Sequence, residues 1–186
     1  MSVGTSPPPL MTAIDDSLYE VVDGVTVEKD VSAFATWLAL KLYRHLGLVL
    51  EDRKLGQLVM EMVFILDPQR NLRRRPDAAV VLNETWSPLQ PPPPTGDWAI
   101  VPDIAIEIVS PGNTYVEMLT KVEEYFRYGV QEVWLAIPEL RTVQVFTSPN
   151  QIHVVGPADL LTSPLIPDWS LQVSNWIPEQ PAASAG

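Results

Sequence analysis

The stretch Val101-Pro102-Asp103-Ile104-Ala105-Ile106-Glu107-Ile108-Val109-Ser110-Pro111 places one acidic residue, Glu107, inside a run of apolar residues. A short apolar run of this kind, bounded by prolines, predicts a buried strand over residues 104–109. An ionised carboxylate in such a strand is costly unless a partner compensates its charge. The sequence therefore predicts a partner for Glu107, either a metal ion or an Arg or Lys in a buried salt bridge.

A second carboxylate, Asp77, stands directly before another apolar run that predicts a strand over residues 78–82. Two carboxylates on neighbouring strands are a typical basis for a Mg²⁺ site. Asp77 and Glu107 are therefore candidate metal ligands, although Asp77 could also simply begin its strand. Upstream, residues 57–66 (QLVMEMVFIL) predict one further strand that carries Glu61, and residues 91–96 (PPPPTG) between the other two predict a loop.

The segment after the Glu107 strand predicts a helix. Asn113 or Thr114 can cap it, and Gly129 stands just past its expected end at Tyr128. Lys121 falls at the edge of the apolar stripe of this helix, from where it could reach back to Glu107. Its ordinary role would be that of a solvated lysine paired with Glu117.

The remaining pattern predicts the rest of an α/β fold. Residues 18–27 indicate a hairpin around Asp23-Gly24. A helix is expected from Asp30 or Ser32 to about His45, ended by Gly47, and strands are expected over residues 132–137, 142–146 and 151–155. This order predicts a single mixed central sheet flanked by helices. We expect a loose N-terminal arm over residues 1–17, one domain over residues 18–177 and a frayed tail over residues 178–186.

Composition limits the function classes. The 186 residues carry a net charge of −11 and include no cysteine, which excludes disulfides, thiolate zinc sites and a cysteine nucleophile. No stretch approaches the roughly 20 apolar residues of a membrane helix, so we expect a cytoplasmic protein without membrane contact. The acidic charge argues against broad nucleic-acid binding. Arg73, Arg74 and Arg75 concentrate positive charge beside Asp77 and are candidates for phosphate contact.

Several ordered motifs together resemble one known family. They are the opening Tyr19-Glu20-Val21-Val22-Asp23-Gly24, Arg75-Pro76-Asp77, the residues 101–111 quoted above, Lys121 and Tyr125, Gly129-Val130, and Glu132-Val133-Trp134-Leu135. This combination is similar to the Uma-type restriction endonuclease family of the PD-(D/E)XK nuclease superfamily, once known only as a domain of unknown function. The resemblance covers about residues 18–176, nearly the whole chain.

The resemblance implies a restriction-endonuclease-like fold with an α-β-β-β-α-β core and a centre that binds Mg²⁺ or Mn²⁺. By position, Asp77 and Glu107 match the metal-binding acids. The standard E-X-K triplet would require lysine at position 109, where this chain has Val109, and the family's displaced lysine falls at Lys121. Glu117 matches a position that is usually Asp, and Glu61 is a further acidic candidate.

Three functions are consistent with these residues. The first is a metal-dependent endonuclease that hydrolyses phosphodiester bonds, with DNA favoured over RNA, working as a homodimer that cuts both strands. The second is a catalytically inactive nuclease-fold module for binding or regulation, motivated by the acidic charge and the displaced lysine. The third is an unrelated acidic scaffold with an internal ion pair between Glu107 and Lys121.

Overall fold

A six-stranded mixed sheet forms the centre of the computed structural model, which describes residues 18–29, 32–94 and 96–179. The strand order is β10-β9-β8-β7-β6-β3, and only β7 and β8 run parallel within it. The strands are β3 (Gly56–Met60), β6 (Ala78–Leu82), β7 (Ile104–Ile108), β8 (Glu132–Ile137), β9 (Thr142–Ser148) and β10 (Gln151–Val155). The predicted mixed sheet flanked by helices is confirmed. The proposed arm over residues 1–17 and residues 180–186 of the proposed tail lie outside the described ranges.

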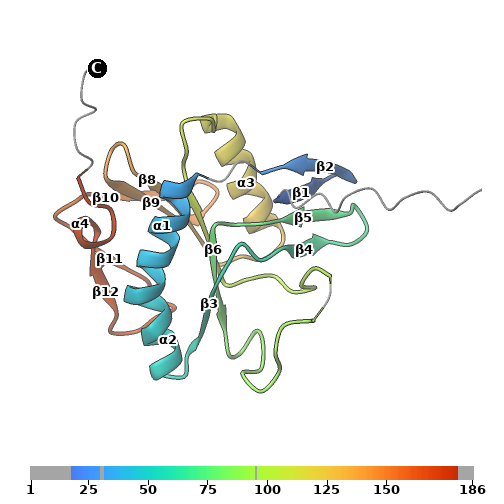
Figure 1. Cartoon of the computed structure of the whole chain (residues 1–186), viewed down its shortest axis with the longest axis horizontal. Helices are drawn as coiled ribbons and strands as arrows, with labels where there is room; N and C mark the ends of the chain where they lie inside the picture. Colours follow the sequence, from blue (N-terminus) through green and yellow to red (C-terminus); the bar gives the residue numbers. More distant parts are fainter. Residues whose placement is uncertain (1–17, 30–31, 95, 180–186) are drawn as a thin grey trace, which may run out of the picture.

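Helices cover both faces of this sheet (Figure 1). One face packs against α1 (Ala33–Leu42), the π-helix η1 (Tyr43–Gly47) and α2 (Leu48–Asp52), and the other against α3 (Tyr115–Arg127). Strand β7 shows how the two cores are separated. Ile104, Ile106 and Ile108 point into the α1 core, whereas Ala105 points into the α3 core. Because side chains alternate along a strand, Glu107 shares the α3 face with Ala105.

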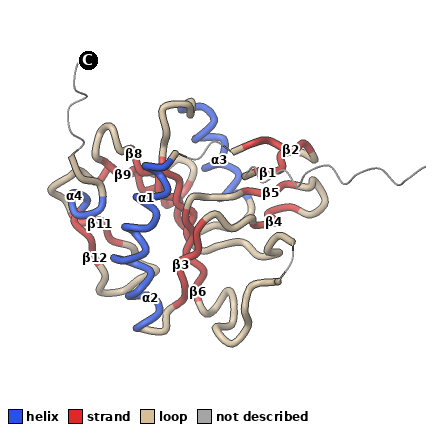
Figure 2. The backbone as a smooth tube through the Cα atoms, in the orientation of Figure 1, coloured by secondary structure: helices blue, strands red, loops and turns tan. Residues whose placement is uncertain are grey.

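A smaller four-stranded sheet lies beside the α3 face, in the order β2-β1-β5-β4 (Figure 2). Its strands are β1 (Tyr19–Val22), β2 (Val25–Glu28), β4 (Phe64–Asp67) and β5 (Leu72–Arg74). The Asp23-Gly24 turn joins β1 to β2 as predicted, with positive φ at both residues. The last elements of the described chain are β11 (Leu160–Thr162), β12 (Ser170–Gln172) and α4 (Val173–Trp176).

Two sequence predictions about these elements are wrong. The single strand expected over residues 57–66 is two strands, β3 and β4, which belong to different sheets. The chain turns at Glu61, whose φ of 50° is unusual for a residue other than glycine. The run contains no Gly, Pro or Asn to mark the turn, so its apolar pattern looked continuous.

The second error concerns Gly47, which does not end the first helix. Ser32 caps α1 as expected, but the helical path continues through η1 and α2 to Asp52. A Cβ on Gly47 would lie 2.5 Å from the ring of Tyr43. Glycine is therefore present here because the ring packs against the backbone, and not because the helix stops.

Among the described residues, no helix is both long enough and apolar enough to cross a membrane.

Gly56 tests how tightly β3 packs on β6. A Cβ at this position would come within 2.8 Å of Leu82 Cα and closer still to the Val81 carbonyl oxygen, both of which are backbone atoms. We expect Gly56→Ala to lower the free energy of unfolding by about 2 kcal/mol, because overpacking forces the backbone to shift. Gly112→Ala is the control, since nothing lies within 4 Å of its added Cβ. Urea denaturation that shows equal stability for the two variants would contradict this account of the packing.

Candidate active site

Strand register brings Asp77 and Glu107 together. Ala78 pairs with Ile106 in the antiparallel β6–β7 ladder, so Asp77, one residue earlier, comes opposite Glu107, one residue later. Residues directly opposite on one face have Cβ atoms about 5 Å apart. Both carboxylates are almost fully buried, at 5% and 2% exposure. The two predicted metal ligands therefore lie side by side in the fold.

Asp77 lies directly before β6, next to the first residue pair of the β6–β7 ladder. Its Oδ2 accepts a 2.5 Å hydrogen bond from the backbone N–H of Ile108, which fixes the carboxylate at the end of β7. Its Oδ1 accepts from the Lys29 ammonium at 2.8 Å. The same ammonium donates to Glu61 Oε2 at 3.1 Å. A lysine that follows β2 thus compensates two acidic groups at once.

Glu107 is held from the opposite side by α3. Its Oε1 accepts hydrogen bonds from the Tyr125 hydroxyl at 2.8 Å and from the Lys121 ammonium at 3.3 Å. Burial raises the pKa of the Glu107 carboxyl; the Lys121 ammonium opposes that rise, and the Asp77 carboxylate adds to it. No hydrogen bond from within the described ranges reaches Oε2 of Glu107. One oxygen of this buried carboxylate is therefore open to a further partner.

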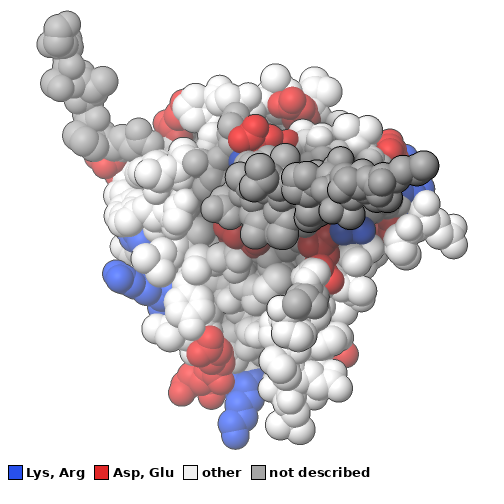
Figure 3. Space-filling model, turned by 45° about the vertical axis from the view of Figure 1, so that its right-hand side comes forward, with Lys and Arg blue, Asp and Glu red and all other residues white. Residues whose placement is uncertain are grey.

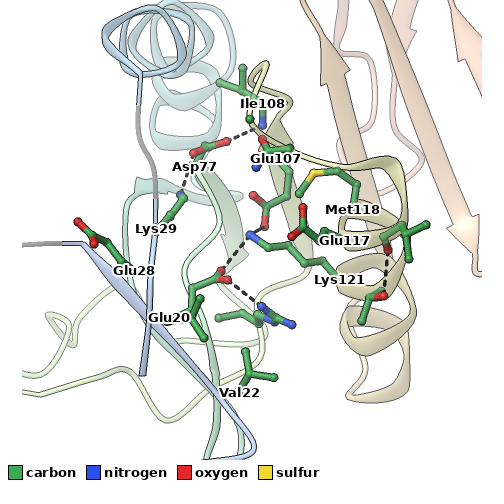
Figure 4. A pocket seen from close by; sticks show the side chains of 16 residues that line it. Glu20, Val22, Glu28, Lys29, Asp77, Glu107, Ile108, Glu117, Met118 and Lys121 are labelled. Carbon is green, nitrogen blue, oxygen red and sulfur yellow. Dashed lines mark hydrogen bonds and ion pairs between the residues drawn. The ribbon is translucent and has the colours of Figure 1, made fainter. Parts of the chain in front are cut away.

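Lys121 reaches from α3 to two carboxylates, as Figure 4 shows. Its ammonium lies 3.3 Å from Glu107 Oε1 and 3.1 Å from Glu20 Oε1. Burial alone lowers the pKa of Lys121, but the two carboxylates outweigh it and raise the pKa above its ordinary value. The side chain is therefore a permanent cation at neutral pH, which excludes it as a general base in this arrangement.

Glu20 connects the small sheet to this cluster. Its Oε2 accepts from Arg74 at 2.7 Å, and its Oε1 accepts from the backbone N–H of Arg75 at 3.0 Å. Burial alone raises the pKa of Glu20, but the Lys121 and Arg74 cations lower it below its ordinary value of 4.5. Arg74 also pairs with Glu124 on α3. This network fastens β1 and β5 to the helix that carries Lys121.

The secondary acidic candidates have different positions. Glu61 stands at the rim of the site and binds Lys29. Glu117 completes a capping box at the start of α3, where its Oε2 accepts from the backbone N–H and hydroxyl of Thr114. These contacts give Glu117 a structural task, and its catalytic candidacy stays a prediction.

The three arginines proposed for phosphate contact all have partners within the protein. Arg74 lines the cavity but is buried between Glu20 and Glu124. Arg73 pairs with Asp97, and Arg75 lies over the Tyr19 ring, so neither lines the cavity. Their contact with phosphate stays a prediction.

A cavity of about 400 Å³ contains the site. Its charged walls come from β1, β2, β5, β7 and α3 and the segments next to them, and comprise Glu20, Glu28, Lys29, Arg74, Asp77, Glu107, Glu117 and Lys121. Within the described ranges, no group of three or more Asp, Glu and His side chains is arranged to hold one metal ion. On the part of the molecular face that is coloured in Figure 3, acidic and basic side chains are interspersed.

Sequence reasoning missed three residues of this site. Glu20 carried a signal, because it lies in the apolar strand Tyr19–Val22 as Glu107 lies in its own strand. Tyr125 was quoted as part of the family motif but received no role, although its hydroxyl donates to Glu107. Lys29 carried no signal, since it stands between acidic neighbours that indicate an ordinary exposed segment.

The fold and this acidic cavity define a nuclease-like α/β protein. The structure is similar to the crystal structure of a protein from Anabaena variabilis described as a putative nuclease of a domain family of unknown function. The TM-score is 0.72 at 19% identity, over 86% of this chain and 89% of that chain. At this identity the likeness establishes the fold alone.

The family is established by sequence. The Uma2 family model, described as putative restriction endonuclease, matches residues 11–174, and the chain belongs to this family. No curated protein matches the chain. The resemblance expected from the ordered motifs is therefore confirmed.

Glu20→Gln tests the network that fastens β1 to α3. The substitution leaves two buried cations without their shared carboxylate, and we expect it to lower the free energy of unfolding at pH 7 by about 3 kcal/mol. Because the pKa of Glu20 is lowered in the fold, its stabilising effect is present above pH 4.5 and is lost as the pH falls through the lowered value. Chemical denaturation from pH 7 to pH 3 should therefore show the difference from the wild type shrinking on acidification. Exposed Glu28→Gln is the control, and a pH-independent difference would contradict the assignment.

Tyr125→Phe tests the hydrogen bond that holds Glu107. Loss of the hydroxyl leaves a buried carboxylate short of one donor, and we expect a cost of about 2 kcal/mol in unfolding free energy. The pKa of Glu107 should rise further, which carboxyl NMR of the labelled protein can follow. Tyr115→Phe is a matched control on the same helix, where the side chain is 59% exposed. An unchanged Glu107 titration would show that the hydroxyl does not stabilise the carboxylate.

Proposed function

We propose that this chain is a divalent-metal-dependent endonuclease that hydrolyses phosphodiester bonds in DNA. Asp77 and Glu107 would hold Mg²⁺ or Mn²⁺, and Lys121 would stabilise charge on the phosphate. The observation that carries the proposal is the meeting of these three side chains in one cavity, from two adjacent strands and a helix. On this proposal they form a PD-(D/E)XK centre in which Lys121 replaces the lysine absent from position 109.

The two carboxylates suit a hard divalent cation. Mg²⁺ in nucleases is commonly held by one or two carboxylates, with substrate oxygens and water completing its octahedron. None of the described residues donates a hydrogen bond to Oε2 of Glu107, and the Ile108 N–H fixes the orientation of Asp77. When bound there, the ion would supply Lewis-acid charge for the phosphate and would lower the pKa of an attacking water.

The chain's own residues would orient the Glu107 carboxylate and stabilise the charge that develops on the phosphate. Tyr125 and Lys121 hold one oxygen of Glu107 and so direct the other toward the cavity. Lys121 remains protonated, so its contribution is a fixed positive charge that accompanies the negative charge developing on the phosphate. Because both groups come from α3, the helix sets the geometry of the acidic pair and of the cation together.

DNA as the substrate and a homodimer as the active form are parts of the proposal. Restriction endonuclease membership favours a nucleic-acid substrate. Arg73 and Arg74 lie on β5 and Arg75 directly follows it, and on this proposal the three arginines would contact the phosphates flanking the scissile bond. Two copies would supply the two centres that cleavage of both strands requires.

A second candidate function is a nuclease-fold module that binds or regulates without turnover. The observation in its favour is that Lys29 and Lys121 already compensate Asp77 and Glu107. The net charge of −11 also opposes tight binding of a polyanion. An unrelated acidic scaffold fits less well, because Asp77 is buried in the cavity and does not point to solvent.

Plasmid cleavage in Mg²⁺ or Mn²⁺ tests the proposal directly. We expect Glu107→Gln to reduce the cleavage rate about a hundredfold or more, because it removes a charged group that the transition state requires. Glu123→Gln on the exposed face of α3 is the matched control and should cut like the wild type. Cutting that persists undiminished in Glu107→Gln would show that the centre lies elsewhere. No cutting by the wild type on supercoiled, linear or single-stranded DNA, with either metal, would favour the inactive module.

A further inference from the structure

Lys29 occupies an unusual position in the site. Its side chain is only 8% exposed, and its ammonium lies 2.8 Å from Asp77 Oδ1 and 3.1 Å from Glu61 Oε2. Figure 4 shows the side chain entering the cavity from the β2 side, opposite the helix that carries Lys121. A cation thus already touches one of the two carboxylates that would hold a metal.

The backbone fixes both ends of this contact. The Lys29 N–H donates to the carbonyl of Leu18 at 2.8 Å, which extends the β1–β2 hairpin to the lysine. Glu61 sits in the left-handed region with φ 50°, and its N–H faces the Asp77 carbonyl at 3.4 Å. A conformation that a glutamate adopts at a cost places its carboxylate next to Asp77. The hairpin and this turn therefore converge on one ammonium.

We propose that Lys29 is a built-in competitor for the divalent metal and sets the metal affinity of the site. The inference rests on the proposed function, since it takes Asp77 and Glu107 as the metal ligands. The ammonium lies 2.8 Å from Asp77 Oδ1, beside the position that a metal ion bound to this oxygen would take. The two positive charges would therefore repel each other strongly. Binding of the ion requires Lys29 to withdraw from Asp77.

Glu61 is the group that receives the withdrawn ammonium. Its side chain is 25% exposed, compared with 6% for Asp77, so it lies nearer to solvent than Asp77 does. Lys29 keeps this partner when it leaves Asp77, and its charge is never left buried and unpaired. The pair of Lys29 and Glu61 therefore allows the same cavity to exist in a lysine-filled form and in a metal-filled form.

Calorimetric titration of the full chain with Mn²⁺ tests this inference without measuring cleavage. We expect Lys29→Met to bind Mn²⁺ about tenfold or more tightly than the wild type, because a neighbouring positive charge is removed. Lys29→Arg keeps that charge and should show no such gain. Lys54→Met removes one exposed positive charge elsewhere and is the control for net charge. If Lys29→Met does not fold, Lys29→Gln removes the charge while keeping a donor for Asp77 and should show the same gain.

The outcomes separate the two proposals. Tighter binding in the Lys29→Met protein that a second substitution, Asp77→Asn, abolishes would support the inference. Wild-type binding with an unchanged or weaker affinity in the neutral variants would overturn the inference while the metal site stands. Absence of Mn²⁺ binding at millimolar concentration in every variant would overturn both the inference and the proposed metal site. A metal-induced rise in Tm gives an independent reading of each case.

Discussion

Compensation of buried negative charge is the constraint on which this structure depends. Asp77 and Glu107 lie opposite each other at the ends of β6 and β7, where burial and the neighbouring Asp77 carboxylate raise the pKa of Glu107. Each is met by a lysine from outside the sheet, Lys29 on the hairpin side and Lys121 on the helix side. The position of the small sheet and of α3 against the central sheet follows from these contacts as well as from apolar packing. The charges that line the cavity therefore also hold it in shape.

The central sheet could be predicted because its strands carry a local signal. The run from Ile104 to Ile108 is apolar at every position except Glu107, and the structure buries all of it. Thr114 and Gly129 likewise marked the ends of α3 correctly. The break at Glu61 could not be predicted, since no residue type there favours a turn. It is decided by which partner each half of the run finds, β6 for one and β5 for the other.

Only those residues of the candidate site that are unusual in their local sequence could be predicted. Glu107 was conspicuous because a charge in an apolar strand needs an explanation, and the same reasoning extends to Glu20 in β1. Asp103 shows the limit of that reasoning. It is as buried as Asp77, yet its oxygens accept from the Leu82 N–H, Thr85 and Gln131, which makes it a structural anchor between β6 and β7. Burial of a carboxylate therefore identifies a need for partners, and only the fold shows which partners it has.

The two lysines of the cavity differ in the elements that carry them and in the exposure of their partners, and the roles that we propose for them follow from this difference. Lys121 extends from a thirteen-residue helix and is bound between Glu107 and Glu20, both almost fully buried. Its two partners hold it beside Glu107 whatever else enters the cavity. Lys29 directly follows a four-residue strand whose residues are all exposed, and one of its partners, Glu61, is 25% exposed. An ammonium that leaves Asp77 keeps Glu61 as a partner nearer to solvent. On our proposals, Lys121 therefore supplies permanent stabilisation of charge, and Lys29 exchanges with an incoming ion.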